Sequence, residues 1–189
     1  MNNPVRVRLQ NHSKYSKDIV WKNALDLEHV TSLHSLTNAE FCLMGAYPES
    51  NDDYEVLIYR STRKLFCLRL NSFGFRKVVA KYQLAQVEYV PLLRVTTALN
   101  SLLRDSKDPG FETDLIDEIV VELPWFLRPF AWVFRRSLAR HARIQCAEDE
   151  PFRQRLNELK EKGISFPYRK FAVPTFEVMF AQFRETLSS

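Results

Sequence analysis

The amino-acid sequence predicts an α+β protein in which one long, curved antiparallel sheet wraps around a long helix in the C-terminal part of the chain. Two observations support this prediction. A run of strand-like segments, separated by turn signals, fills the middle of the chain, and the apolar spacing becomes helical after Pro124. Runs of strands followed by helices are typical of α+β proteins. A curved sheet closed by one long helix is a helix-grip fold, which encloses an internal cavity between the sheet and the helix.

The whole chain, residues 1–189, is expected to form a single helix-grip domain. Of its 189 residues, 46% are apolar and 26% are charged, which are the proportions of an ordinary globular domain. We expect the core to cover about residues 4–165 and a last amphipathic helix to cover residues 175–187.

The first predicted elements are short. Residues 5–9 alternate apolar and charged side chains, which predicts a half-buried strand. Residues 18–22 form a second short apolar segment. Residues 24–36 carry leucines and a valine close to helical spacing, and Thr37 and Asn38 follow them as a stop signal. We therefore expect a helix that ends there.

The run of strands follows this helix. The polar segments PESNDD, after the first strand, and DSKDPG, before the last, have the composition of turns. Residues 63–64 and 71–74 mark further turns. The predicted strands are residues 41–47, 54–59, 65–70, 75–89, 92–103 and 111–123.

The helix after Pro124 is the longest element that the sequence predicts. Residues 125–144 place aromatic and aliphatic side chains on one broad face, and five arginines collect on the rest. We interpret the arginines first as a solvated face, with contact to an anion or a membrane surface as the alternative. Pro151 is expected to kink or restart the helix, which then continues over residues 152–162 to a cap at Gly163.

The composition excludes several classes of function. The net charge of +4 does not demand a nucleic-acid partner, and the four glycines form neither a GxGxxG motif nor a P-loop. We therefore expect no nucleic acid. Apolar runs fall far short of the ~20 residues that a membrane helix needs, so no transmembrane segment is expected. The chain does not open with a secretory signal, and a cytoplasmic location is our expectation.

Cysteine and aromatic residues add two further expectations. Cys42, Cys67 and Cys146 are scattered and odd in number, so we interpret them as reduced thiols. The chain also has 14 Phe, 7 Tyr and 3 Trp residues. These rings fill a bulky core or, on the alternative reading, line an apolar cavity that binds a small molecule.

Two histidines in one short segment are candidate metal ligands. Asp26, His29 and His34 form the run D-x2-H-x4-H on the helix that precedes the strands. Imidazoles bind iron or zinc, and one of the carboxylates in the cluster of Glu148, Asp149 and Glu150 would complete a set of two histidines and one carboxylate. Five residues separate the histidines, which rotates them by roughly 140° on an ideal helix. Both reach one metal only if the helix is distorted or ends between them.

The alternative for these residues is purely structural. The histidines then lie on the polar face of a surface helix, and Glu148 and Asp149 belong to a solvated acidic patch. On this interpretation the histidines point to solvent and Asp149 pairs with an arginine such as Arg153. The distance between the imidazoles and the Asp149 carboxylate distinguishes the two interpretations.

Two motifs in the chain can be compared with a known family. They are Trp21-Lys22 followed by Asp26-x2-His29-x4-His34, and Glu148-Asp149-x4-Gln154. Together they resemble the catalytic-domain motifs of Rieske-type aromatic-ring-hydroxylating oxygenase alpha subunits. That domain has a helix-grip fold related to START-like and polyketide-cyclase-like proteins. The resemblance covers about residues 18–165, with identity confined to the two motifs.

The resemblance implies a role for each matching residue. His29 and His34 would be iron ligands, Asp149 the carboxylate ligand with Glu148 in reserve, and Asp26 the aspartate that links the iron to an electron donor. The chain departs from the family because none of its cysteines has the C-x-H or C-x2-H spacing of a Rieske centre. No [2Fe-2S] cluster is therefore expected in this chain, and electrons would come from a separate electron-transfer protein.

Two hypotheses about function follow from these patterns. The first is a non-haem iron oxygenase-like catalytic domain in which Fe(II), or Zn in its place, lies next to an apolar or aromatic small molecule. The second is a non-catalytic helix-grip protein that binds a lipid, polyketide or aromatic ligand in its cavity. A metal-assisted cyclase or hydrolase on the same fold lies between them. Metal content separates the first hypothesis from the second.

Overall fold

The computed structural model describes residues 4–26, 38–48, 55–65 and 68–164. The helices in these ranges are one 3-10 helix, η1, and two α-helices, α1 and α3. In chain order the elements are β1 (Val5–Ser13), α1 (Lys17–Leu25), β2 (Asn38–Pro48), β3 (Glu55–Leu65), β4 (Leu68–Ala80), β5 (Gln83–Val90), β6 (Val95–Asp105), β7 (Thr113–Glu122), η1 (Trp125–Phe130) and α3 (Ala131–Glu161).

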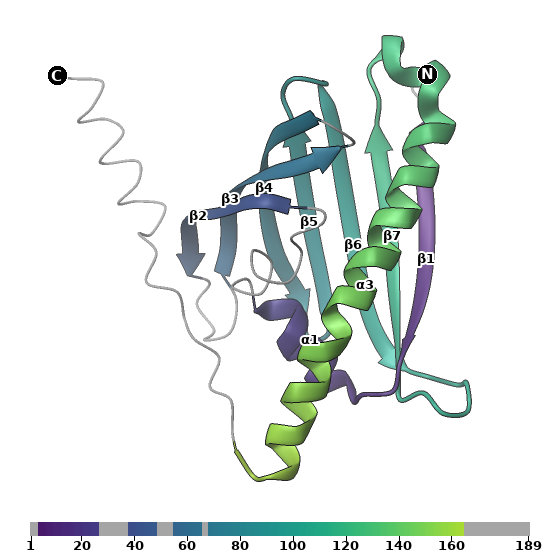
Figure 1. Ribbon diagram of the computed structural model, residues 1–189. Coiled ribbons are helices and arrows are strands. Elements are labelled where there is room, and N and C mark those ends of the chain that lie inside the picture. Colours follow the sequence, from purple (N-terminus) through teal and green to yellow (C-terminus); the bar gives the residue numbers. More distant parts are fainter. Residues whose placement is uncertain (1–3, 27–37, 49–54, 66–67, 165–189) are drawn as a thin grey trace, which may run out of the picture.

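The seven described strands form one antiparallel sheet with the order β1-β7-β6-β5-β4-β3-β2 (Figure 1). From β2 to β7 each strand pairs with the next one in sequence, and β1 pairs with the outer edge of β7. The register shifts between Leu43 and Gly45 in β2 and between Val78 and Ala80 in β4. Such irregularities bend a sheet and increase its twist. The sheet therefore curves, and β2 to β4 turn toward the helix side.

Helix α3 lies across the inner face of the sheet, where it contacts β1 and α1 (Figure 1). This arrangement confirms the predicted α+β helix-grip fold. Pro151 lies inside α3, so the helix continues through the position where a kink or restart is predicted. Its end agrees with the prediction, because Lys162 caps the helix and Gly163 follows with a left-handed φ of 70°.

The single strand predicted for residues 75–89 is in fact two strands. β4 ends at Ala80, β5 begins at Gln83, and Tyr82 makes the turn between them with a φ of 68°. The prediction fails because left-handed turn positions usually carry Gly, Asn or Asp, and here the position is a tyrosine. Tyr82 tolerates it because its ring packs edge-on against Trp21, with 5.9 Å between ring centroids.

The turn predicted at residues 71–74 lies inside β4. Gly74 is opposite Tyr59 in β3, and the tyrosine ring lies where a Cβ at position 74 would be. Here glycine allows the close approach of a neighbouring side chain, which is one of its established uses within strands.

Helix α1 begins earlier than predicted. It covers Lys17–Leu25, which includes the residues 18–22 expected as a short apolar segment. Asp26 follows the helix with an extended backbone (ψ 105°), so the helix ends before Asp26 and does not continue through it. The rest of the helix predicted for residues 24–36, and the helix predicted for residues 175–187, lie outside the described residues.

Two hydrophobic clusters lie between α3 and the sheet, at opposite ends of the helix. We call them the packed end and the pocket end. The buried residues of the packed end are Tyr15, Ile19, Val20, Trp21, Val78, Leu84, Leu103 and Leu156. The buried residues of the pocket end are Val7, Val95, Ile119 and Val121, with Leu127, Phe134 and Leu138 packed against them. Only the packed end includes residues of α1.

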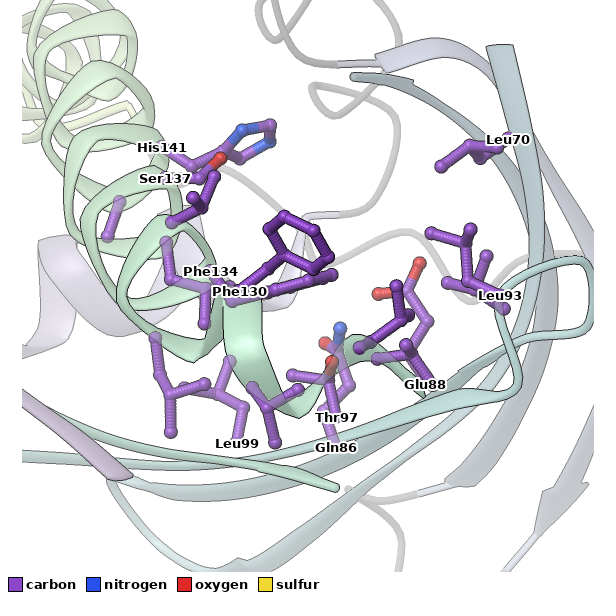
Figure 2. Close-up of a pocket in the computed structure, with 18 of the residues that line it drawn as sticks. Leu70, Gln86, Glu88, Leu93, Thr97, Leu99, Phe130, Phe134, Ser137 and His141 are labelled. Carbon is purple, nitrogen blue, oxygen red and sulfur yellow. The ribbon is translucent and has the colours of Figure 1, made fainter. Parts of the chain in front are cut away.

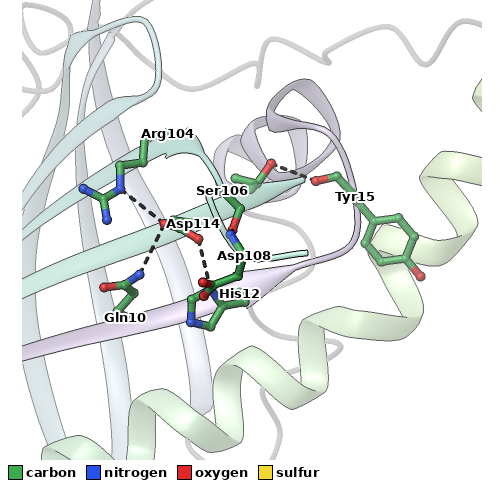
Figure 3. Close-up of polar contacts among 8 residues, drawn as sticks. Gln10, His12, Tyr15, Arg104, Ser106, Asp108 and Asp114 are labelled. Carbon is green, nitrogen blue, oxygen red and sulfur yellow. Dashed lines mark hydrogen bonds and ion pairs between the residues drawn. The ribbon is translucent and has the colours of Figure 1, made fainter. Parts of the chain in front are cut away.

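A polar network links β1 to the β6–β7 hairpin close to the turn of that hairpin (Figure 3). The carboxylate of Asp114, buried in β7, accepts hydrogen bonds from Gln10 Nε2 (3.2 Å) and Arg104 Nε (3.3 Å), and lies 3.0 Å from His12 Nδ1. A hydrogen bond from Ser106, followed in size by those of His12 and Arg104, lowers the pKa of Asp114. The carboxylate is therefore stabilised in its charged form.

Candidate ligand-binding pocket

A pocket of about 430 Å³ lies between the sheet and the first half of α3 (Figure 2). This volume falls within the range of about 300–1,000 Å³ found for small-molecule sites. The sheet wall consists of Leu70, Gln86, Glu88, Val90, Leu93, Val95, Thr97, Leu99, Ile119 and Val121. The helix wall consists of Leu127, Phe130, Val133, Phe134, Ser137, Leu138, His141, Ala142 and Gln145. The internal cavity expected from the fold class is thus present.

The pocket is apolar because of the periodicity of its two walls. On α3, Phe134, Leu138 and His141 recur at intervals of three and four residues, which places them on one helical face. On β6, Val95, Thr97 and Leu99 recur at every second residue, as strand side chains do. Figure 2 shows the rings of Phe130 and Phe134 projecting into the space between the walls.

One acidic side chain interrupts the apolar sheet wall. Glu88 in β5 is only 7% exposed, and Figure 2 shows its carboxylate turned toward the pocket. Its Oε1 atom accepts a hydrogen bond from Ser61 Oγ at 3.1 Å and another from Ser72 Oγ. The two serine hydroxyls also lie 2.7 Å apart. Two donors from two neighbouring strands therefore hold Glu88 in one orientation, which offsets part of the cost of its burial.

Other polar groups lie on both walls of the pocket. Gln86 and Thr97 line the sheet wall near Glu88, and Ser137 and His141 line the helix wall (Figure 2). A largely apolar pocket with a few placed polar groups is the usual composition of a site that orients one small molecule.

A buried polar cluster closes the pocket toward the packed end. It consists of Ser101, Asp117, Cys146, Asp149 and Arg153. Ser101 Oγ donates to Asp117 Oδ1 at 2.6 Å, and Arg153 Nη2 donates to Asp149 Oδ2 at 3.1 Å. Burial raises the pKa of Asp117, and the hydrogen bond from Ser101 and the charge of Arg153 only partly oppose this effect. Burial likewise raises the pKa of the Cys146 thiol, so it is held in the uncharged form.

The structure places only some of the predicted metal-site residues. His29 and His34 lie outside the described residues, so their distance to Asp149 stays untested. Asp149 is paired with the buried guanidinium of Arg153, which is the arrangement expected on the structural alternative. Asp26 follows the end of α1, and Glu148 lies on α3 beside Asp149.

No three His, Cys, Asp or Glu side chains among the described residues are grouped so that they could hold a metal ion. Because both histidines of the predicted site lie outside the described residues, the iron site with His29, His34 and Asp149 remains a prediction. In the described residues, the Asp149 carboxylate already forms an ion pair with Arg153. This ion pair does not favour a metal ion at the same carboxylate.

Glu88 is a polar pocket residue that was not predicted from the sequence. Leu84, Gln86, Glu88 and Val90 lie at every second position of β5 and therefore share one face of the sheet. On this face the two outer residues, Leu84 and Val90, are apolar, and the two central residues, Gln86 and Glu88, are polar. This pattern is the sequence signal that identifies Glu88 as a polar residue within an apolar wall. The signal is hidden because residues 75–89 are predicted as one strand, although β4 and β5 are separate strands.

Comparisons with known proteins bear on the fold. Neither the protein-family models nor the curated protein sequences include a match. Among solved structures, the chain is similar to a protein of unknown function, SA2116 from Staphylococcus aureus, with a TM-score of 0.60 and 9% identity over 83% of this chain and 98% of the other. It is also similar to Ara h 8.0201, with a TM-score of 0.52 and 9% identity over 77% of this chain and 98% of the other.

A third similar structure is the di-domain ARO/CYC protein BexL from the BE-7585A biosynthetic pathway. The TM-score is 0.56 and the identity 14%, over 78% of this chain and 50% of BexL. At these identities the likeness shows the fold alone. The protein has a helix-grip, Bet v1-like fold. Neither described α-helix, α1 or α3, is long and apolar enough to cross a lipid bilayer.

Proposed function

We propose that this protein binds an apolar small molecule in the pocket between the sheet and α3. The observation behind the proposal is the pocket itself, about 430 Å³ in volume and lined mainly by aliphatic and aromatic side chains from both layers. An apolar ligand of matching size gains about 25 cal/mol for each Å² of apolar surface that it removes from water. Similarity to Ara h 8.0201 and to a protein of a biosynthetic pathway supports the helix-grip fold on which the proposal depends.

The ligand we propose carries one hydrogen-bond donor at its end nearest β5. Glu88 presents a carboxylate, an acceptor without protons when ionised, to the pocket. A hydroxyl or an amine of the ligand can donate to such an oxygen, whereas a ligand carboxylate has only acceptors when it is ionised and cannot donate. Ligands with a hydroxyl or amine are therefore expected to bind more tightly than acids of the same size.

A series of ligands with the same alkyl chain tests both parts of this proposal. Displacement of a neutral fluorescent dye from the purified protein is measured with the alcohol, the amine and the carboxylate. We expect the alcohol and amine to bind at least about tenfold more tightly than the carboxylate, which corresponds to about 1.4 kcal/mol. Equal binding of all three overturns the donor requirement, and no displacement by any of them overturns the pocket as a binding site.

Glu88→Gln is the matched substitution for this series. A glutamine keeps an oxygen that can accept from Ser61 and Ser72 but removes the charge and adds a donor. The preference for the alcohol and amine over the carboxylate is expected to shrink or reverse. The control is Glu118→Gln in β7, an exposed side chain paired with Arg8, which is expected to leave the preference unchanged.

The motif of Asp26, His29, His34 and Asp149 supports a second candidate, an iron-dependent oxygenase-like domain that receives electrons from a separate protein. Elemental analysis of protein purified without added metal tests it. Stoichiometric iron that is lost in His29→Ala would support this candidate and Fe(II) as the cofactor. A metal-free protein that carries a co-purified apolar ligand would contradict the iron-dependent candidate and leave ligand binding as the proposed function.

A further inference from the structure

Five large hydrophobic side chains are exposed at one end of the molecule. We call this group the aromatic rim; it consists of Leu92, Trp125, Phe126, Phe130 and Trp132. Trp125 is 78% exposed, Leu92 76% and Trp132 67%. Single exposed apolar residues are normal on protein surfaces, but several rings on one short segment usually mark an interaction site.

The aromatic rim lies at the same end of the molecule as part of the pocket lining. β7 ends where β6 begins, since Glu122 pairs with Thr96, so the β5–β6 turn and η1 lie at the same end of the sheet. Both segments also contribute to the pocket, with Leu93 from the turn and Leu127 and Phe130 from η1. Phe130 lines the pocket and is also 53% exposed, which places the opening beside it.

The chain segment that carries most of the rim and continues into the first half of α3 is strongly basic. Residues 124–145 contain five arginines and no aspartate or glutamate. Arg128, Arg135, Arg136, Arg140 and Arg143 are all exposed, and Arg135 also donates a hydrogen bond to the carbonyl of Arg6 in β1. The nearest acid before this segment is Glu122, the last residue of β7.

We propose that the aromatic rim docks on the surface of a bilayer that contains anionic lipids, so that the pocket exchanges its ligand with the lipid phase. Tryptophan and phenylalanine favour the interfacial region of a bilayer, and arginines beside them attract anionic headgroups. A bilayer fits this end better than a protein partner, because exposed tryptophan and phenylalanine side chains are accompanied by exposed arginines and no acid between residues 124 and 145, a combination that favours an anionic lipid surface. The ligand exchange rests on the proposed function, whereas the docking can be measured without it.

Co-sedimentation with vesicles tests the docking. The probes are vesicles of phosphatidylcholine alone and vesicles in which phosphatidylserine replaces one quarter of it. We expect binding to the second kind, weakening as salt is added, because arginine–headgroup attraction is screened. Trp125→Ala combined with Trp132→Ala is expected to weaken binding at least about tenfold. Arg136→Gln combined with Arg140→Gln is expected to remove mainly the part that depends on phosphatidylserine.

Phe75→Ala is the matched control, because Phe75 is 47% exposed on the outer face of β4, away from the rim. It is expected to bind vesicles like the parent. Circular dichroism melts that match the parent show that the rim variants fold. Equal binding of the parent and the folded tryptophan variant overturns the proposal, as does a complete lack of binding to the anionic vesicles.

Two further measurements separate the proposal from its alternatives. If the parent forms dimers that the tryptophan double variant does not, and binds no vesicles, the rim is a protein interface and the proposal fails. Dye binding in the absence of vesicles is measured on the same variants. Retained dye binding with no vesicle binding overturns the docking while leaving the proposed function intact, whereas vesicle binding without dye binding supports the docking and counts against the pocket.

Discussion

The two ends of the space between α3 and the sheet differ in what fills them. At the packed end, α1 lies between α3 and the strands, and its Ile19, Val20 and Trp21 are almost completely buried. At the pocket end, none of the described elements lies between α3 and the same sheet, and a space of about 430 Å³ remains. The strands and the helix run through both ends.

This difference shows that the pocket follows from the position of α1 and does not require unusual wall residues. Aliphatic side chains of β6 are buried at both ends, Leu103 in the packed end and Val95 in the pocket end. A long helix held against a curved sheet leaves a gap wherever no third element fills it. The buried polar cluster around Arg153 and Asp117 lies between the packed end and the pocket end, and it separates the solid core from the pocket.

Trp21→Ala tests the packed end and is expected to have the largest effect. The variant removes a buried indole that packs against Tyr82, and the surrounding core can collapse only in part. We expect a loss of about 3–5 kcal/mol in the free energy of unfolding. Urea denaturation followed by circular dichroism measures it.

Phe134→Ala is the counterpart at the pocket end. One side of this ring already borders the open pocket, so it has fewer contacts to lose. We expect a loss of about 1 kcal/mol in stability together with clearly weaker dye binding. If Phe134→Ala costs as much stability as Trp21→Ala, the pocket is not an open space and the contrast between the two ends is wrong.

The fold class was predictable from the sequence because it depends on periodicity. Alternating strands and one long amphipathic helix leave few ways to bury their apolar faces. The β4–β5 turn and the extent of α1 were not predictable. Tyr82 adopts a left-handed conformation that its neighbours in space stabilise, and the burial of α1 depends on Leu156, far along the chain.

Ala142→Phe tests the pocket end by filling it. Ala142 lines the pocket from α3, and the larger ring is expected to occupy part of the space that a ligand uses. We expect dye binding to weaken at least about tenfold while stability changes by no more than about 1 kcal/mol. Ala147→Phe, at an exposed position of the same helix, is the control. Unchanged dye binding in Ala142→Phe would show that the ligand does not bind in this pocket.

The candidate site was predictable only in outline. Aromatic content and fold class indicated a cavity, and the cavity is there. The polar groups within it follow from strand register, since Glu88 meets Ser61 and Ser72 only because β3, β4 and β5 are adjacent. A single sequence does not reveal such a register, which turns and bulges set. The histidine motif was the more visible pattern, yet it lies outside the described residues and stays a prediction.

Substitution of Asp117 in the buried polar cluster is expected to change the free energy of unfolding least, and the direction of the change can be predicted. Burial raises its pKa in the folded protein, so at neutral pH the folded state holds a carboxylate that is less favourable there than in the unfolded chain. Asp117→Asn removes the charge and keeps an oxygen that can accept from Ser101. The variant is therefore expected to be slightly more stable than the parent at neutral pH, despite losing its attraction to Arg153.

This advantage is expected to shrink as the pH falls through the folded pKa of Asp117 and to vanish below about pH 4, where the unfolded aspartate is also protonated. Asp114→Asn is the matched contrast, because the pKa of Asp114 is lowered and its charge stabilises the fold. That variant is expected to be less stable than the parent at neutral pH, with a gap that also closes in acid. That gap closes only below about pH 4, as the pH falls through the lowered folded pKa of Asp114, so urea denaturation of the three proteins is followed from neutral pH into this more acidic range. If Asp117→Asn is less stable than the parent at neutral pH, the pull of Arg153 outweighs the cost of burial, and the cluster stabilises the boundary between the two ends.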